Sequence, residues 1–184
     1  ALAARLVARA GEPLLAIGPG GSWIGKRWPN ERYAFAVTQL TRAGGAMAGA
    51  RVVLLGGANE MKVAEPVRRA VDRERLIDLT GQADLLIAYA CLKRARLYIG
   101  NATALTQAAA ASGCPTLALF GPTDEALYAP VGPYVPVLRG PRTFEEVRRS
   151  DPQLSQPVCH MFDMSVEAVV RGATRLLAET RGVT

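Results

Sequence analysis

The sequence is poor in the residues that build disulfide frameworks and metal sites. It contains three cysteines, which are widely spaced and form no C-x-x-C pair, and a single histidine, His160, next to Cys159. An odd cysteine count without close pairs argues against a disulfide framework or a zinc site and favours a reducing compartment. Cys159 and His160 could act as a pair of metal ligands, but no further ligand residues cluster beside them. We therefore expect no metal, and we expect a cytoplasmic protein.

The sequence also lacks a long apolar run and a recognisable leader. No stretch reaches the roughly 18 uninterrupted apolar residues that a transmembrane helix needs. The first residues do not begin with Met and lack the long apolar centre of a signal peptide. Residues 1–11 instead show a helical pattern, which predicts a linker helix that arrives from a preceding domain. We expect residues 1–184 to form a single domain of a longer protein.

Aromatic residues make up only 6% of the chain, and no dense basic run is present. Both features argue against a nucleic-acid-binding protein, so we expect no nucleic acid among its partners. The formal net charge is nevertheless +6. Such an excess of cations favours anionic partners such as nucleotides or lipid phosphates. An arginine-rich surface that serves no partner is the alternative that composition leaves open.

What the sequence does contain is a regular alternation of apolar runs and helical patterns. The predicted strands are residues 14–18, 51–56, 75–79, 97–100, 116–120 and 134–138. Most are apolar throughout, as is typical of strands buried on both faces of a parallel sheet. The predicted helices are residues 30–43, 60–72, 82–94, 103–112 and 165–180, and residues 140–157 form a loop or an irregular helix. This order predicts a doubly wound, mainly parallel α/β domain of about six strands.

Glycine ends or closely follows each of the first five predicted strands. In an open α/β sheet, ligands bind outside the carboxyl ends of the strands, so these positions are candidate site residues. Glycine lets a ligand approach the backbone closely, and the helix that follows offers free N–H groups to an anion. Turns between strands and helices often contain glycine for structural reasons alone, but five in one chain favour a shared ligand cleft.

The segment GPGGSWIGKRWP, residues 18–29, nearly matches the phosphate-binding P-loop. Arg27 replaces the Ser or Thr that would hold magnesium, and Trp23 is bulky where the chain must wrap around phosphates. Pro29 places the start of the next helix after Lys26 rather than at it. The segment also fails the G-x-G-x-x-G dinucleotide pattern, because Trp23 occupies the third glycine position. What remains is a turn with free N–H groups and a mobile lysine, which suits a diphosphate held without a metal.

Several motifs together resemble the C-terminal half of the family 9 glycosyltransferases, the ADP-heptose:lipopolysaccharide heptosyltransferases. They are PGGSWIGKRWPNERYAFAV (residues 19–37), VVLLGGANE (residues 52–60) and LIDLTGQADLLIAYACLKRARLYIGNATALTQAAAASGCPTLALFGPTD (residues 76–124). The resemblance covers nearly the whole chain and implies a Rossmann-like, donor-binding half of a two-domain GT-B enzyme. It also implies that the catalytic carboxylate and the site for a lipid-linked saccharide acceptor belong to an N-terminal half, so that this domain alone is inactive. Peripheral membrane contact would then belong to the full-length protein.

The resemblance and the strand ends together select candidate residues for a nucleoside-diphosphate sugar such as ADP-heptose. No catalytic residue and no metal ligand is expected in this chain. The expected donor-phosphate contacts are Gly21, Ser22, Lys26, Asn101 and Thr103, and the expected nucleoside-side residues are Gly57, Glu60, Thr80 and Gly81.

One motif departs from the family. The resemblance implies Asp-Ser/Thr-Gly followed by a His, whereas this chain has Ala102, Thr103 and Ala104, with Gln107 at the His position. A different donor, weaker donor binding or loss of turnover are all compatible with this change. The alternatives are therefore a non-catalytic nucleotide-binding or scaffold module and, less well supported, a UDP-sugar epimerase. An oxidoreductase is disfavoured, because no acidic residue lies about 20 residues after the glycines.

Overall fold

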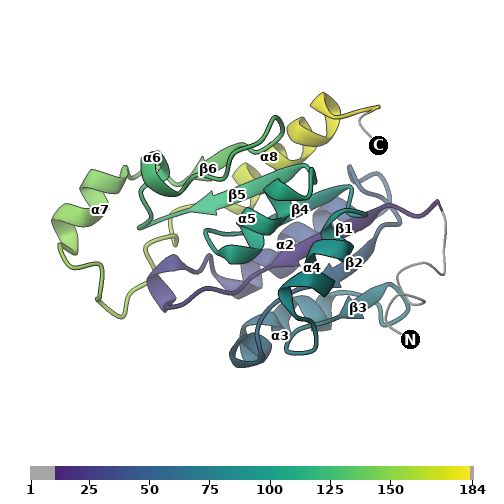
Figure 1. Ribbon diagram of the computed structural model, residues 1–184, viewed down its shortest axis with the longest axis horizontal. Helices are drawn as coiled ribbons and strands as arrows, with labels where there is room; N and C mark the ends of the chain where they lie inside the picture. The colour runs from purple at the N-terminus through teal and green to yellow at the C-terminus, as the bar shows by residue number, and fades with distance from the viewer. Residues whose placement is uncertain (1–10, 183–184) are drawn as a thin grey trace.

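The computed structural model describes residues 11–182, and the helix expected over residues 1–11 lies almost wholly outside this range. Its centre is a six-stranded sheet in the order β3-β2-β1-β4-β5-β6 (Figure 1). The strands are β1 (Leu14–Gly18), β2 (Arg51–Leu54), β3 (Leu76–Asp78), β4 (Leu97–Asn101), β5 (Thr116–Phe120) and β6 (Val137–Arg139). Every neighbouring pair is parallel. The predicted Rossmann-like α/β fold is confirmed, with the strand order reversing between β1 and β4.

Helices cover both faces of the sheet. On one face lie α2 (Asn30–Thr41), α3 (Met61–Ala70) and α8 (Val166–Glu179), and on the other lie α4 (Leu85–Leu92) and α5 (Ala104–Ala111). Two short helices, α6 (Glu125–Tyr128) and α7 (Phe144–Ser150), follow β5 and β6. In the described part of the chain, no helix is long and apolar enough to cross a membrane.

The strands are apolar throughout because both faces of the sheet are buried. In β1, Leu15 and Ile17 pack in the core beneath α2 and α8, while Leu14 and Ala16 pack in the core beneath α4 and α5. All five residues of β1 are buried, as are all five of β4 and β5. A continuous apolar run therefore predicted these strands better than an alternating pattern would have.

The expected last strand was placed too early in the sequence. The backbone of Tyr134 and Pro136 already accepts hydrogen bonds from Thr116 and Ala118 at 2.9 and 3.1 Å. Proline has no N–H to donate in return, so regular pairing begins only at Val137.

The segment expected as a loop or irregular helix contains the regular helix α7. It begins with a capping box, in which the Thr143 hydroxyl accepts a hydrogen bond from the Glu146 N–H and the Glu146 carboxylate accepts one from the Thr143 N–H. This T-x-x-E pattern is visible in the sequence and is a known start signal for helices. A capped helix thus follows the last strand.

Candidate functional site

A cavity of about 510 Å³ opens at the carboxyl edge of the sheet, beside the point where the strand order reverses. Its walls are residues 20–26 after β1, residues 55–60 after β2, residues 83–88 at the start of α4, and residues 102–105 after β4. Four loops that are far apart in the sequence therefore meet at one place. This is the position at which open α/β sheets bind their ligands.

The cavity gathers most of the residues that the sequence singled out. The predicted residues that line it are Gly21, Ser22, Lys26, Gly57, Glu60 and Thr103. The structure places the other three, Asn101, Thr80 and Gly81, outside the lining, where they support the loops. The sequence missed the apolar wall formed by Leu55, Leu85 and Leu105, because apolar residues after strands carry no distinctive signal.

The bulky residues of the first loop anchor it to the body of the domain. Trp28 is completely buried, and its indole Nε1 donates a 2.9 Å hydrogen bond to the Met164 carbonyl. The Arg27 Nε donates to the Gly21 carbonyl at 2.9 Å, which ties the two ends of the loop together. Lys26 ends a short 3-10 turn, Ile24–Lys26, and lines the cavity. The helix α2 begins at Asn30, after Pro29, as predicted.

Asn101 lies beneath this loop and is completely buried. Its Oδ1 accepts hydrogen bonds from the Trp28 N–H at 3.1 Å and the Tyr33 hydroxyl at 2.9 Å. Its Nδ2 donates to the carbonyls of Pro19 and Gly20 at 2.9 and 2.8 Å. These four bonds use the full capacity of the amide. Asn101 therefore fixes the backbone of the first loop by hydrogen bonds and does not line the cavity.

Glu60 joins the first and second loops. Its Oε1 accepts a 2.7 Å hydrogen bond from the Gly21 N–H, and its Oε2 accepts a 2.8 Å bond from the Gly57 N–H. The Gly21 N–H, expected to be free for a phosphate, is thus engaged with a carboxylate. A Cβ on Gly20 would lie 2.1 Å from Oε1, so only glycine allows the carboxylate to come this close. Glu60 thus holds the loop after β1 and the loop after β2 together.

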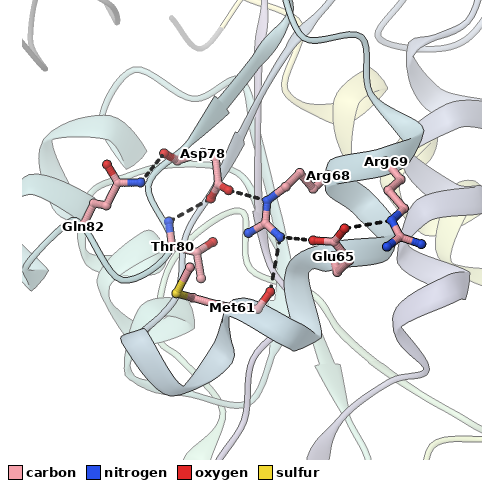
Figure 2. A network of polar contacts seen from close by, with 7 residues as sticks. All are labelled: Met61, Glu65, Arg68, Arg69, Asp78, Thr80 and Gln82. Atoms are coloured by element: carbon pink, nitrogen blue, oxygen red, sulfur yellow. Dashed lines mark hydrogen bonds and ion pairs between the residues drawn. The ribbon is translucent and has the colours of Figure 1, made fainter.

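Thr80 and Gly81 support the second loop from the β3 side. The Gly81 N–H donates to the Gly56 carbonyl at 2.9 Å, and Gly81 adopts a φ of +72° that favours glycine. The Thr80 N–H donates to Asp78 Oδ1 at 3.0 Å, and Arg68 Nε donates to Asp78 Oδ2 at 2.6 Å (Figure 2). Partial burial alone would raise the pKa of Asp78. The hydrogen bonds from Thr80 and Arg68 have the larger effect and lower that pKa below its usual value.

Arg68 extends this network along α3. Its guanidinium also pairs with Glu65 and donates to the Met61 carbonyl, and Glu65 in turn accepts from Arg69 Nε at 2.8 Å (Figure 2). The network fixes the end of β3 to α3, the helix that follows Glu60. The turn containing Thr80 and Gly81 is therefore positioned by charged residues that lie outside the cavity.

The N-terminus of α5 forms another wall of the cavity. Thr103 is the N-cap residue, but its side chain makes no capping hydrogen bond. The first-turn N–H groups and the helix dipole thus favour an anion at this end. Ala102 and Ala104 flank Thr103 and contribute no charge. Gln107, one turn further on, donates from Nε2 to the Tyr128 carbonyl at 2.9 Å and links α5 to α6.

The charges around the cavity are few. Its charged lining residues within the described chain are Lys26, Glu60 and Asp84. Asp84 caps α4 by accepting a 2.8 Å hydrogen bond from the Ile87 N–H, and Glu60 is bound to two N–H groups. Both carboxylates thus accept structural hydrogen bonds, while Lys26 and the α5 N-terminus offer positive charge. The arrangement suits a ligand with a phosphate and an apolar, planar group.

No metal site is formed within residues 11–182, where no three His, Cys, Asp or Glu side chains come close enough to hold an ion. His160 instead forms a buried 3.0 Å contact with Asp151, and the Cys159 thiol donates to the Arg27 carbonyl. Both residues thereby support the loops around the site rather than forming the pair of metal ligands that their adjacency suggested.

The profile of the family "Glycosyltransferase family 9 (heptosyltransferase)" matches residues 2–155. The chain belongs to glycosyltransferase family 9. This family 9 chain is 30% identical over 131 residues to lipooligosaccharide heptosyltransferase 2 of Haemophilus influenzae, covering 69% of the chain and 36% of that protein. It is 28% identical over 143 residues to lipopolysaccharide heptosyltransferase 2 of Salmonella typhimurium, covering 76% of the chain and 40% of that protein. The matched segments therefore span well under half of these relatives.

Solved structures of family 9 proteins share the fold. The Escherichia coli ADP-heptose lipopolysaccharide heptosyltransferase II matches with a TM-score of 0.78 at 22% identity, over 98% of this chain and 51% of that one. A family 9 glycosyltransferase from Veillonella parvula matches with a TM-score of 0.77 at 24% identity, over 97% and 51%. The E. coli heptosyltransferase WaaC, solved with ADP, matches with a TM-score of 0.65 at 23% identity, over 91% and 45%. The present chain thus corresponds to about half of a GT-B structure.

Proposed function

We propose that this chain is the donor-binding half of a glycosyltransferase that moves a sugar from a nucleoside-diphosphate sugar to a lipopolysaccharide-type acceptor. The observation that supports it most directly is the convergence of Lys26 and the uncapped N-terminus of α5 on one cavity with an apolar wall. Heptose is the sugar and ADP the carrier that the relatives favour, since the E. coli heptosyltransferase WaaC was solved with ADP and with ADP-2-deoxy-2-fluoro heptose.

In this proposal the diphosphate lies between Ser22 and Lys26 on one side and Thr103 on the other. The nucleoside extends toward Gly57 and Glu60 and packs against the apolar wall of Leu55, Leu85 and Leu105. As the bond to the sugar breaks, negative charge grows on the departing diphosphate. A lysine and a helix N-terminus held in place beforehand stabilise that charge without having to reorganise.

The same proposal assigns no catalytic base to this chain. The two carboxylates that line the cavity have structural roles: Glu60 ties two loops together and Asp84 caps α4, each by accepting hydrogen bonds from backbone N–H groups. The base and the acceptor site would come from the other half of a GT-B protein. The chain alone would bind the donor without transferring the sugar, in a protein that works in the cytoplasm at the face of the membrane carrying its acceptor.

A titration of the chain with ADP by calorimetry tests donor binding. We expect Lys26→Ala to weaken ADP binding about 10- to 150-fold, as expected for the loss of a charge-assisted hydrogen bond worth about 1.5–3 kcal/mol. Lys62→Ala is the matched control, because Lys62 is an exposed lysine of α3 outside the cavity. If the wild-type chain bound no nucleotide at millimolar concentration, the scaffold alternative would replace this proposal.

A further inference from the structure

The helices α4 and α5 together present an exposed surface without charge. They lie side by side on the near face of the sheet (Figure 1), and the Tyr89 hydroxyl of α4 donates a 3.4 Å hydrogen bond to the Ala111 carbonyl of α5. Neither helix contains a charged residue, although 21% of the whole chain is charged. Helical spacing lines up six exposed or half-buried residues on their outer side, which we call the α4–α5 face: Leu86, Tyr89 and Ala90 of α4, and Ala104, Ala108 and Ala111 of α5.

Large apolar side chains project on both sides of the alanines of α5. Leu86 projects from α4 with an exposed fraction of 80%. The polar Gln107 of α5 turns aside toward α6, where it donates a 2.9 Å hydrogen bond to a backbone carbonyl. On the other side of α5 lies the loop of Val131, which is 92% exposed, and a Cβ on the next residue, Gly132, would lie 3.9 Å from the Ala110 carbonyl oxygen. The outer side of α5 is thus a strip of methyl groups between projecting apolar residues.

The helices on the opposite face of the sheet have a different outer surface. Charged residues occur in α2, α3 and α8, and some of them pair one helical turn apart, as Arg69 does with Glu65 and Arg175 with Glu179. Such pairs are typical of helices that face water. A connected apolar surface with a projecting leucine instead marks a place where another molecule binds. The α4–α5 face is therefore a candidate interaction surface.

Charges of opposite sign lie at the two ends of α4. The exposed Asp84 is the N-cap residue of α4, and the exposed Lys93 and Arg94 directly follow its last residue, Leu92. Asp84 Oδ1 accepts one hydrogen bond from within the helix, from the Ile87 N–H at 2.8 Å, and a carboxylate can accept further bonds. The α4–α5 face therefore has an acidic end at the carboxyl edge of the sheet and a basic end at the amino edge.

We propose that the α4–α5 face binds the same face of a second copy of this chain, with a two-fold axis perpendicular to the face. Such an axis makes α4 antiparallel to the α4 of the other copy, so Asp84 meets the partner's Lys93, and the same contact forms a second time. The Leu86 side chain of each copy packs on the methyl strip of the other copy's α5. Because each copy carries a net charge of +6, the uncharged face also lets two copies meet with little repulsion.

An anionic membrane is the other partner for an exposed leucine beside two cations. The membrane would attract Lys93 and Arg94 at one end of the face but repel Asp84 at the other, and the face between them adds no basic residue. Only a partner with both signs of charge pairs both ends at once, and a second copy supplies them in the right order. The charge pattern thus favours self-association. This proposal does not depend on the nucleotide or on sugar transfer.

Sedimentation velocity over a series of chain concentrations measures the association. We expect a reversible dimer with a dissociation constant in the micromolar range, as interfaces of modest size give. Leu86→Ala should weaken it about 10- to 50-fold by removing apolar carbons from the contact, and Lys93→Ala about two- to fivefold by removing an exposed ion pair. Phe35→Ala is the matched control and should leave the association unchanged, because Phe35 is 63% exposed on α2, across the sheet. Circular dichroism checks that each variant folds.

A carbodiimide crosslink tests the antiparallel arrangement, because it joins a carboxylate directly to an amine that touches it. Within one chain, Asp84 and Lys93 lie at opposite ends of α4, about 14 Å apart along its axis, so they cannot be joined there. An equal mixture of ¹⁴N- and ¹⁵N-labelled chains shows by mass spectrometry which links form between copies. We expect a mixed-isotope link between Asp84 and Lys93.

Three results would overturn the proposal. They are a chain that stays monomeric at every concentration, a dimer that Phe35→Ala weakens and Leu86→Ala does not, and a dimer without the link between Asp84 and Lys93. A monomer that co-sediments with phosphatidylglycerol vesicles, and loses this binding in Leu86→Ala, would assign the face to a membrane instead. The separate titration with ADP decides the proposed function, whichever way these measurements fall.

Discussion

Asn101 is the residue whose replacement tests the architecture of the site most severely. In Asn101→Ala, the Trp28 N–H, the Tyr33 hydroxyl and the carbonyls of Pro19 and Gly20 all lose their partner in a fully buried place. A net contribution of about 0.5–1.5 kcal/mol for each of the bonds gives a sum of about 2–6 kcal/mol. Because neighbouring effects are not additive, we expect the free energy of unfolding to fall by about 3–5 kcal/mol.

The assay is equilibrium denaturation in urea, followed by circular dichroism. Tyr33→Phe is a matched comparison, because it removes one of the bonds and keeps the ring that packs edge-on against Trp28 at 4.9 Å. We expect Tyr33→Phe to cost about 1 kcal/mol. If Asn101→Ala costs no more than Tyr33→Phe, Asn101 does not organise the first loop, and our account of how Lys26 is positioned is wrong.

Three further predictions follow from single contacts. Gly20→Ala should loosen the bridge from Glu60 to the first loop, because its Cβ would lie 2.1 Å from the carboxylate, which must move away. We expect ADP binding to weaken about 2- to 12-fold in calorimetry, the effect of one lost hydrogen bond worth about 0.5–1.5 kcal/mol, and an unchanged affinity would contradict the bridge. The lowered pKa of Asp78 should stabilise the fold above the unfolded pKa of about 3.9, with the gain lost as pH falls through the folded value. Asp78→Asn should therefore flatten the pH dependence of thermal unfolding between pH 5 and pH 3, and an identical slope would refute this. Burial raises the pKa of Cys114 to about 12, so its thiol is protonated and inaccessible at pH 8. A thiol reagent at pH 8 should therefore label the partly exposed Cys159 first and Cys114 only on unfolding. Peptide mass mapping shows the order, and labelling of Cys114 before Cys159 would contradict the prediction.

Local sequence signals were enough for the scaffold. The bounds of β1 and β5 were predicted to the residue, because both strands are unbroken apolar runs buried on both faces. The start of α2 followed from Pro29, which restricts the residue before it. The predicted last strand began too early, because Pro136 interrupts its pairing with β5. The helix α7 was not predicted as a regular helix, although the T-x-x-E pattern of its capping box is present in the sequence.

The roles of particular site residues depended on contacts that no local pattern contains. Asn101 meets the Trp28 backbone from 73 positions away, and Glu60 reaches Gly21 across 39 positions. The sequence placed both residues at strand ends, where either a ligand contact or a structural role was possible. Only the folded chain shows that Asn101 supports the loop from below and that Glu60 ties two loops together. The grouping of Lys26 with Thr103 could be predicted, because β1 and β4 are neighbours at the reversal of strand order.

The departures at Ala102, Ala104 and Gln107 gain a physical meaning from the structure. The two alanines leave the α5 N-terminus without a carboxylate, so they do not oppose an anion there. Gln107 bonds to the Tyr128 carbonyl and thereby holds α6 against α5. Lys26 and the helix N-terminus that would hold the phosphate remain in place despite these substitutions.

The central claim is that a nucleoside diphosphate binds between Lys26 and the N-terminus of α5. A crystal structure of the chain soaked with ADP tests it most directly. The account predicts the diphosphate within hydrogen-bonding distance of Lys26 Nζ and the first N–H groups of α5, with the base against Leu55 and Leu85. A nucleotide bound elsewhere on the surface, or one whose phosphates contact neither Lys26 nor α5, would contradict it.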